Sequence, residues 1–277
     1  MIGAAALPDR PALAASAVAV AVVRDGGLWR EIRVFAETGS TNQDVAAAAE
    51  AGAPEGLVIV AEAQTAGRGR FDRRWASPPR AGLTFSALLR PGPAVPVARW
   101  SWLPLLAGLS VQRTVARLTG LEAAVKWPND LLLGPGRRKA AGLLVQASGA
   151  AAVLGVGLNV TTTSAELPDG ATSLAVEGAP GIDRGHLLAA VLDQFAEDYR
   201  GWTAAAGDAA GCGLRAAYLR VCDTVGGPVR VTRPDGTGLD GVATTVDRTG
   251  RLVLRTAAGE QAVSAGDVQH VRPGPRS

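Results

Sequence analysis

Apolar residues along this 277-residue chain recur with two different spacings, and each spacing predicts a kind of element. Short apolar runs bounded by turn residues are typical of strands. Apolar residues three and four positions apart predict amphipathic helices. We expect strands at 31–36, 57–63, 82–90, 123–126, 130–133, 139–146 and 152–158. We expect helices at 12–23, 40–51, 96–118, 183–202 and 214–222. Ser40 or Thr41 can cap the second helix, and Pro104 should kink the third or divide it in two.

The order of these elements predicts the fold class. Strand-length runs follow one another between 123 and 158 without an intervening helix, which favours a mixed or antiparallel sheet over a doubly wound one. After Gly226 the pattern of apolar and polar residues changes. It predicts short strands with alternating apolar and polar residues at 229–232, 241–247, 251–255 and 261–264, typical of a barrel of about fifty residues. We therefore predict an α+β protein, with a helix-flanked sheet and a small C-terminal β-barrel. The expected divisions are a helical segment 1–30, a large domain 31–222 and the barrel 223–277.

Composition narrows the class of protein. The chain is 47% hydrophobic and 19% charged, which argues against disorder. No apolar run reaches the length of about eighteen residues that a membrane-spanning helix needs, and residues 12–23 lack a signal peptide's basic start. Cys212 and Cys222 form no CxxC pair, which excludes a zinc ribbon and suits a reducing compartment. We expect a cytoplasmic protein that does not contact membranes.

The positive charge is concentrated in one loop. Residues 64–80 carry five arginines against the single acid Asp72, although the net charge of the whole chain is only +3. Of the 28 basic residues only Lys126 and Lys139 are lysine, so the chain uses arginine almost everywhere. A retained lysine can mark a site that needs a compact ammonium, although any one of them could survive by chance. Asparagine is also scarce in this chain and occurs only at Asn42, Asn129 and Asn159.

The loop itself has the composition of an anion-binding site. Gly67 and Gly69 allow backbone amides to converge on an anion, and Arg68 and Arg70 add forked donors for phosphate or carboxylate. Trp75 supplies a flat face for an aromatic or cationic partner. A flexible Arg/Gly surface loop that contacts RNA nonspecifically fits the loop alone equally well.

Two further segments carry polar residues at strand ends. In KWPND, Pro128 is expected to hold the chain extended, so that Asn129 and Asp130 can enter a cleft, but taken alone the segment favours a plain hairpin turn, because Asn-Asp pairs are common turn residues. In RKAAG, Lys139 begins a buried strand and Gly142 permits close approach, although such a lysine is usually a snorkelling edge residue. Asn159 ends another strand, in GVGLN, which lacks the third glycine of a dinucleotide fingerprint. His186 and His270 are interpreted as structural.

Taken in order, the motifs resemble those of the biotin protein ligase family. They are STN at 40–42, QTAGRGR with RRW at 64–75, KWPND at 126–130, RKAAG at 138–142 and GLN at 157–159. The ending VSAGDVQHV is similar to that family's C-terminal domain, so the resemblance covers residues 31–272. The chain departs from the family at Asp72, where the family usually has glycine. Residues 1–30 are too short for the winged helix of bifunctional members, so the chain resembles the monofunctional type.

The resemblance implies a fold related to class II aminoacyl-tRNA synthetases with an SH3-like barrel. It implies that biotin and ATP form biotinyl-5′-AMP with Mg²⁺, and that biotin then passes to a lysine of a biotin carboxyl carrier protein. No nucleic-acid partner is implied, and a homodimer stays open. A lipoate or octanoate ligase of the same fold is one alternative. The other, a non-enzymatic nucleic-acid binder, fits poorly because residues 223–277 contain no aromatic side chain for stacking on bases.

The resemblance also implies roles for individual residues. The biotin site would comprise Ser40, Thr41, Asn42, Gln64, Arg68, Gly69, Arg70, Lys139 and Gly142. The ATP and adenylate site would comprise Arg70, Trp75, Asn129, Asn159 and Lys139. Lys139, Arg70, Arg68 and Asp130 would be catalytic, with Asp130 either binding Mg²⁺ or orienting the acceptor lysine. Leu143, Leu144 and Val145 would form an apolar wall, and the loop 64–79 would be mobile until it orders over the adenylate.

Overall fold

A seven-stranded sheet forms the centre of the molecule in a computed structural model, which describes residues 10–271 apart from the side chain of Asp72. The sheet order is β1-β2-β3-β7-β6-β5-β4, with β1 and β2 parallel and every other neighbouring pair antiparallel. The mixed sheet confirms the predicted fold class. Its strands are β1 (Glu31–Phe35), β2 (Leu57–Ala61), β3 (Gly82–Leu89), β4 (Ala123–Lys126), β5 (Asp130–Leu133), β6 (Arg138–Ser148) and β7 (Ala151–Asn159). The expectations about Asp72 lie outside the described side chains.

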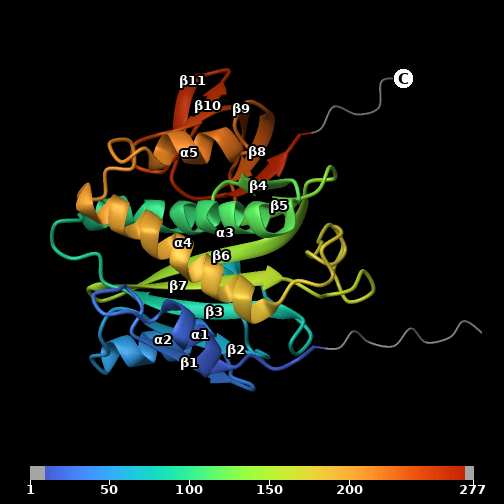
Figure 1. The fold of residues 1–277 in the computed structure, drawn as a ribbon. Coiled ribbons are helices and arrows are strands. Elements are labelled where there is room, and N and C mark those ends of the chain that lie inside the picture. The colour runs from blue at the N-terminus through green and yellow to red at the C-terminus, as the bar shows by residue number, and fades with distance from the viewer. Residues whose placement is uncertain (1–9, 272–277) are drawn as a thin grey trace, which may run out of the picture.

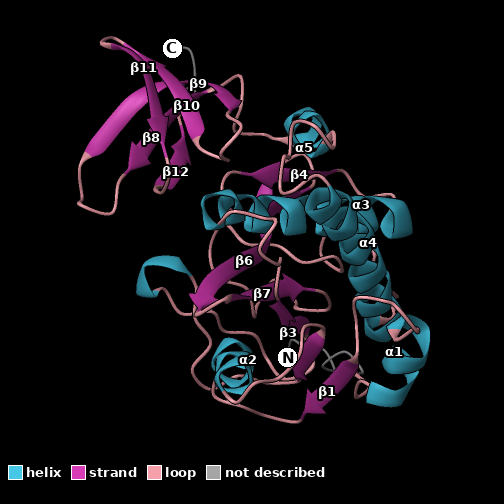
Figure 2. Ribbon diagram, turned by 90° about the vertical axis from the view of Figure 1, so that its left-hand side faces the viewer, coloured by secondary structure: helices cyan, strands magenta, loops and turns pink. Residues whose placement is uncertain are grey.

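Helices cover the two faces of this sheet unequally. Figure 2 shows α1, α3 and α4 on one side of the sheet and α2 on the other. The bounds are α1 (Ala15–Val22), α2 (Thr41–Glu50), α3 (Leu103–Thr119), α4 (Arg184–Ala204) and α5 (Leu214–Val221). The larger core lies beneath the first group, whereas the buried apolar residues of α2, Val45 and Ala49, belong to a small cluster that includes Ile59. The face beneath α2 is therefore only partly covered, and it is free to form a site.

The C-terminal residues form a five-stranded antiparallel sheet, seen at the top of Figure 1. Its order is β11-β10-β9-β8-β12, which fits the predicted SH3-like barrel. The strands are β8 (Pro228–Thr232), β9 (Gly238–Val246), β10 (Leu252–Thr256), β11 (Gly259–Val263) and β12 (Asp267–His270). The sequence did not predict β12, because four residues show no usable alternation and their pairing with β8 is long-range. Indole nitrogens of Trp102 and Trp127 donate to carbonyls in the β9–β10 turn, at 2.9 and 3.0 Å.

Local details confirm one expectation and correct two. Pro104 does divide the predicted helix, because a 3₁₀ turn (Val97–Trp102) precedes α3 and the proline lies in the first turn of α3. Ser40 occupies the N-cap position of α2, but neither its side chain nor that of Thr41 caps the helix. Pro128 does not hold an extended chain, since residues 127–129 form a tight turn after a cis peptide bond and Lys126 pairs with Asp130. None of the helices within residues 10–271 has the length and apolarity needed to cross a membrane.

Candidate active site

A cavity of about 800 Å³ lies on the sheet face that α2 covers only in part. The start of α2, the ends of β5, β6 and β7, and the polar loop after β2 all contribute to its wall. Every candidate residue from the sequence lines it: Ser40, Thr41, Asn42, Gln64, Arg68, Gly69, Arg70, Trp75, Asn129, Asp130, Lys139, Gly142 and Asn159. Leu143 and Leu144 also line it, but Val145 does not, since it packs against the main core. Motifs spread over about a hundred residues of sequence therefore meet in one place.

One end of the cavity is a network of neutral hydrogen-bonding groups. Gln64 Oε1 accepts from the Thr41 backbone N–H at 2.8 Å and lies 3.1 Å from Thr41 Oγ1. Thr41 Oγ1 lies 2.7 Å from Ser86 Oγ, which donates to Asn42 Oδ1 at 2.6 Å. Asn42 Nδ2 in turn donates to Gln146 Oε1 at 2.8 Å. The network holds these side chains in fixed orientations, and it explains why the Thr41 hydroxyl does not cap α2.

Ser86 and Gln146 were missed by the sequence analysis. Ser86 is fully buried within β3, whose other residues are mostly apolar. A buried polar residue needs a hydrogen-bonding partner, so a serine in an apolar strand was a signal that could have found it. Gln146 offered no such signal, because it lies on an exposed part of β6 and reaches the network only through Asn42.

Glycines of β6 and β7 leave room for two of the site's side chains. A β-carbon on Gly155 would overlap Asn42, with its Cγ only 2.9 Å away. A β-carbon on Gly157 would overlap the indole of Trp75, with Nε1 at 2.5 Å, and Gly142 pairs directly with Gly157 across the two strands. Trp75 therefore lies against a shelf of two glycines, and its buried Nε1 has no hydrogen-bonding partner within the described chain.

The opposite end of the cavity is charged. Lys139 Nζ lies 2.7 Å from Asp130 Oδ1, and the two residues come from neighbouring strands. Arg70 donates to Asn129 Oδ1 at 3.3 Å, while Asn129 Nδ2 donates to the Leu143 carbonyl at 2.8 Å. Burial lowers the pKa of the Arg70 guanidinium, and the charges of Asp130 and Asp267 oppose that shift. A guanidinium remains charged at neutral pH despite such a shift, so this end offers cations to an anionic ligand.

The arginine loop contacts the C-terminal barrel. Arg73 forms an ion pair with Asp267 at 2.5 Å, and Arg70 donates to the Gly266 carbonyl at 3.2 Å. Within the loop, Gly69 N–H donates to the Arg73 carbonyl at 2.6 Å, whereas Arg68 is exposed. The contacts with β12 could not be predicted, because they join residues almost two hundred positions apart.

A third wall of the cavity is a segment without helix or strand, residues 162–171, which the sequence analysis did not assign to the site. Its backbone pairs with Lys139, whose N–H donates to the Gly170 carbonyl at 3.1 Å and whose carbonyl accepts from Thr172 N–H at 2.8 Å. The side chain of Asn159 donates to the Thr172 carbonyl at 3.0 Å. This segment and Thr172, the residue directly after it, thus hold two of the residues that line the cavity.

Asp130 is the magnesium ligand that the sequence analysis considered, and the structure places it beside Lys139. No group of three His, Cys, Asp or Glu side chains that could hold a metal occurs among the residues the structure describes. The carboxylate of Asp130 is paired with the ammonium of Lys139, which competes with a divalent cation for the same oxygen. In many nucleotide sites Mg²⁺ is bound by one or two carboxylates together with substrate phosphates, so a single carboxylate such as Asp130 is chemically suited to share such an ion with a triphosphate.

Comparison with known proteins agrees with this geometry. Residues 34–161 match the Biotin/lipoate A/B protein ligase family, and residues 224–271 match the biotin protein ligase C-terminal domain. A biotin–[acetyl-CoA-carboxylase] ligase of Mycobacterium tuberculosis is 40% identical over 95% of this chain and 97% of its own. A ligase of the same name from Paracoccus denitrificans is 30% identical over 85% of this chain and 98% of its own.

A solved structure has the same architecture. The biotin protein ligase of Aquifex aeolicus in complex with biotin and ATP superposes with a TM-score of 0.74 and 25% identity, covering 88% of this chain and all of that one. Matching motifs, a matching catalytic fold and a matching C-terminal domain therefore coincide in one chain. The chain belongs to the biotin protein ligase family.

Proposed function

We propose that this protein joins biotin to ATP and then transfers the biotin to a specific lysine of a biotin carboxyl carrier protein. In the first step a carboxylate oxygen of biotin attacks the α-phosphorus of ATP. The new P–O bond replaces the bond to pyrophosphate, which leaves, and biotinyl-5′-AMP results. The observation that carries the proposal is the single cavity that combines a neutral hydrogen-bonding end with a cationic end.

The neutral end suits the head group of biotin. Its ureido ring offers both donors and acceptors, which amide and hydroxyl groups can match. We assign this role to Ser40, Thr41, Asn42 and Gln64, with Gly142 allowing the ligand to approach the sheet. Three of these side chains are already ordered by the Ser86 network, so binding costs little side-chain entropy.

The cationic end suits the reacting anions. Two anions must meet in the first step, so positioning and charge stabilisation carry the catalysis. We assign Arg68, Arg70 and Lys139 to the carboxylate and α-phosphate, with Gly69 allowing the loop to approach them. Trp75, Asn129 and Asn159 are assigned to the nucleotide. When bound, Mg²⁺ would travel with the triphosphate of ATP.

In the second step the amine of the acceptor lysine attacks the acyl carbon of the mixed anhydride, AMP leaves, and the nitrogen loses a proton. We assign Asp130 to orienting that lysine, since its carboxylate lines the cavity beside Lys139. For the described residues, the division expected from the sequence would be a helical segment up to residue 30, the catalytic domain at 31–222 and the barrel from 223; residues 1–9 and 272–277 lie outside the described residues. We further propose that the protein acts in the cytoplasm, where its carrier substrates are made. Sizing in solution tests whether it forms a homodimer.

The decisive experiment is incubation with ATP, Mg²⁺, biotin and a carrier domain, followed by a streptavidin blot. We expect a biotin- and ATP-dependent band that is lost when the acceptor lysine of the carrier is replaced. Exchange of labelled pyrophosphate into ATP should depend on biotin; dependence on lipoate or octanoate instead would assign the related ligase activity. Salt-sensitive nucleic-acid retention without any exchange would support the binding-protein alternative.

Gly155→Ala should weaken biotin binding selectively. The added methyl overlaps Asn42, which must leave its place between Ser86 and Gln146. A lost hydrogen bond in a buried network is worth about 1–3 kcal/mol, so KM for biotin should rise roughly 10- to 100-fold. Pyrophosphate exchange at varied biotin, with ATP saturating, measures this change.

Gly201→Ala is the matched control for this substitution. Gly201 lies within α4, and a β-carbon there meets no atom within 4 Å. The control should leave KM for biotin unchanged. If Gly155→Ala also left it unchanged, Asn42 would have no part in holding biotin.

Biotin and ATP together should protect the arginine loop from trypsin. Arg68, Arg73 and Arg74 are exposed in this structure, and the loop's outer contact is the exposed ion pair of Arg73 with Asp267. Exposed ion pairs contribute about 0–1 kcal/mol, so the free loop should open readily. Cleavage within residues 68–74, followed by mass spectrometry, should slow when both ligands are present. Equal cutting with and without ligands would contradict closure of the loop over the adenylate.

A further inference from the structure

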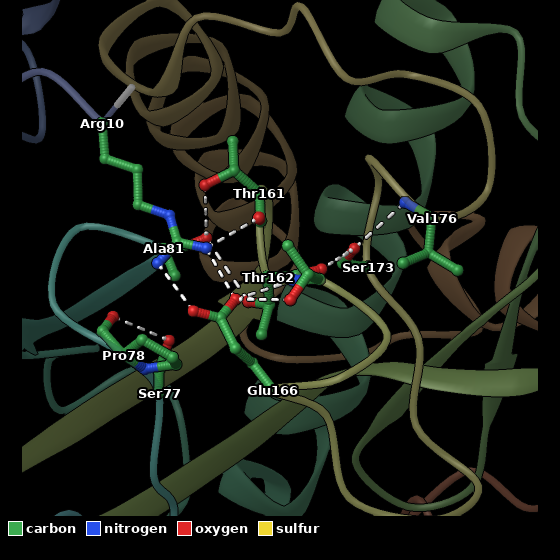
Figure 3. Close-up of polar contacts among 10 residues, drawn as sticks. Arg10, Ser77, Pro78, Ala81, Thr161, Thr162, Glu166, Ser173 and Val176 are labelled. Carbon is green, nitrogen blue, oxygen red and sulfur yellow. Dashed lines mark hydrogen bonds and ion pairs between the residues drawn. The ribbon is translucent and has the colours of Figure 1, made fainter. Parts of the chain in front are cut away.

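The N-terminal segment before α1 is fastened across the edge of the active site. Arg10 makes a two-pronged ion pair with Glu166, with NH2 to Oε2 at 2.7 Å and NH1 to Oε1 at 3.1 Å. The same guanidinium donates to the Thr161 carbonyl at 3.0 Å. Figure 3 shows the Arg10 side chain reaching between Thr161 and Glu166. The pair joins residues 156 positions apart, so it is a tertiary contact and not a local turn.

The contact is well shielded. The Arg10 side chain is 10% exposed and that of Glu166 is 19% exposed. Hydrogen bonding to Arg10 lowers the pKa of Glu166 to about 2, so the pair stays charged at neutral pH. A charged, forked and partly buried pair of this kind is stronger than an exposed surface pair.

Glu166 belongs to the 162–171 wall of the cavity. Its carboxylate also accepts from the backbone N–H and the hydroxyl of Thr163, both at 2.9 Å. Thr161, directly before the wall, and Thr162, its first residue, donate their hydroxyls to the Ala81 carbonyl, as Figure 3 also shows. Arg10 therefore connects the fixed base of the wall to its middle. The following residues, 167–171, line the cavity and pair with the backbone of Lys139.

A second attachment keeps the N-terminal segment in place. Arg184 donates to the Pro11 carbonyl at 2.6 Å, and Glu62 accepts from Leu13 N–H at 2.5 Å. Arg184 and Glu62 are themselves a buried ion pair. The backbone that carries Arg10 is therefore anchored, and this holds the Arg10 side chain beside Glu166. Both family models match only residues that lie after this N-terminal segment.

We propose that Arg10 is a positioning residue of the ligase: through Glu166 it holds the 162–171 wall against the nucleotide end of the cavity. Gly170 of the wall accepts from the backbone N–H of Lys139, which we assign to the biotin carboxylate and the α-phosphate, and Thr172, directly after the wall, accepts from Asn159, which we assign to the nucleotide. None of these hydrogen bonds reaches the Thr41–Gln64–Asn42 network, which we assign to the biotin head group. Loss of the contact should therefore weaken ATP binding and leave biotin binding intact. The inference rests on the proposed function for its kinetic consequence only.

The kinetic test compares Arg10→Gln with the wild-type chain in biotin-dependent pyrophosphate exchange. We expect KM for ATP to rise about tenfold, the size of one lost charged hydrogen bond, with KM for biotin unchanged. Glu166→Gln should reproduce the effect, and the double variant should be no worse than either single one, because both remove the same contact. Arg10→Lys, which keeps a single charged contact, should fall between wild type and Arg10→Gln. An unchanged KM for ATP in both single variants would overturn the proposal.

A matched control and a second readout separate positioning from general destabilisation. Arg24→Gln removes an arginine of the same region, whose ion pair with Asp193 is exposed, and should change neither KM.

A Glu-specific protease should cut after Glu166 faster in Arg10→Gln than in the wild type or in Arg24→Gln, whether or not the protein is active, and mass spectrometry measures this cleavage. Inactive wild-type protein would defeat the proposed function, whereas active wild-type protein with equal cutting after Glu166 in all three chains would defeat this inference. An equal rise of KM for biotin and ATP would likewise assign Arg10 to stability alone.

Discussion

Lys139→Arg should abolish most of the adenylation activity although it conserves the charge. The ammonium of Lys139 lies 2.7 Å from Asp130 in a space bounded by Gly142 and the indole of Trp75. A guanidinium is wider and planar, so it cannot place a single compact charge there and turn its donors freely. Removing one donor that stabilises developing charge costs about 2.7–4 kcal/mol, so kcat of pyrophosphate exchange should fall roughly 100- to 1000-fold.

Arg138→Lys provides the matched control for that substitution. Arg138 immediately precedes Lys139, but its side chain is 44% exposed and pairs with Glu177. The reverse exchange one position away should leave exchange activity near the wild-type level. Biotin binding measured by calorimetry would show that the Lys139→Arg protein is folded. Near-normal kcat in Lys139→Arg would remove this lysine from the proposed chemistry.

Arg184→Met should produce the largest loss of stability. Arg184 and Glu62 pair at 2.7 Å, and each side chain is only 5% exposed. The guanidinium also donates to the Gly82 and Pro11 carbonyls, so the substitution leaves a buried carboxylate and two carbonyls without it. Breaking a buried ion pair by removing one partner costs about 3–5 kcal/mol, and urea unfolding should show a loss of this size.

Two further variants make this result specific to the buried charge. Arg184→Met combined with Glu62→Gln removes both charges, keeps an acceptor for Leu13 N–H, and should recover much of the lost stability. Arg230→Met removes a solvent-exposed pair with Asp240 and should leave the unfolding midpoint unchanged. Equal losses in Arg184→Met and Arg230→Met would contradict the importance of burial.

The candidate site was predictable to the extent that its residues stand in short motifs. Lys139 stood out because the chain otherwise uses arginine, and the structure brings it beside Asp130. The hairpin interpretation of KWPND and its assignment to the site were weighed as alternatives, yet the segment is a hairpin turn and lines the cavity as well. Pro128 and the capping of α2 were misjudged, because a local preference gave way to the turn and to the Ser86 network.

The amino-acid pattern by itself determined the mixed sheet and the change of pattern near Gly226, because each depends on the spacing of neighbouring residues. The positions that line the cavity followed from short motifs through their resemblance to the biotin protein ligase family. Only the tertiary structure decided that Ser86 orders the neutral end, that β12 contacts the arginine loop and that Arg10 reaches the 162–171 wall. These contacts join residues between 44 and 194 positions apart. Nothing in local spacing specifies such a partner, since it is chosen by how the two sheets and the chain termini pack.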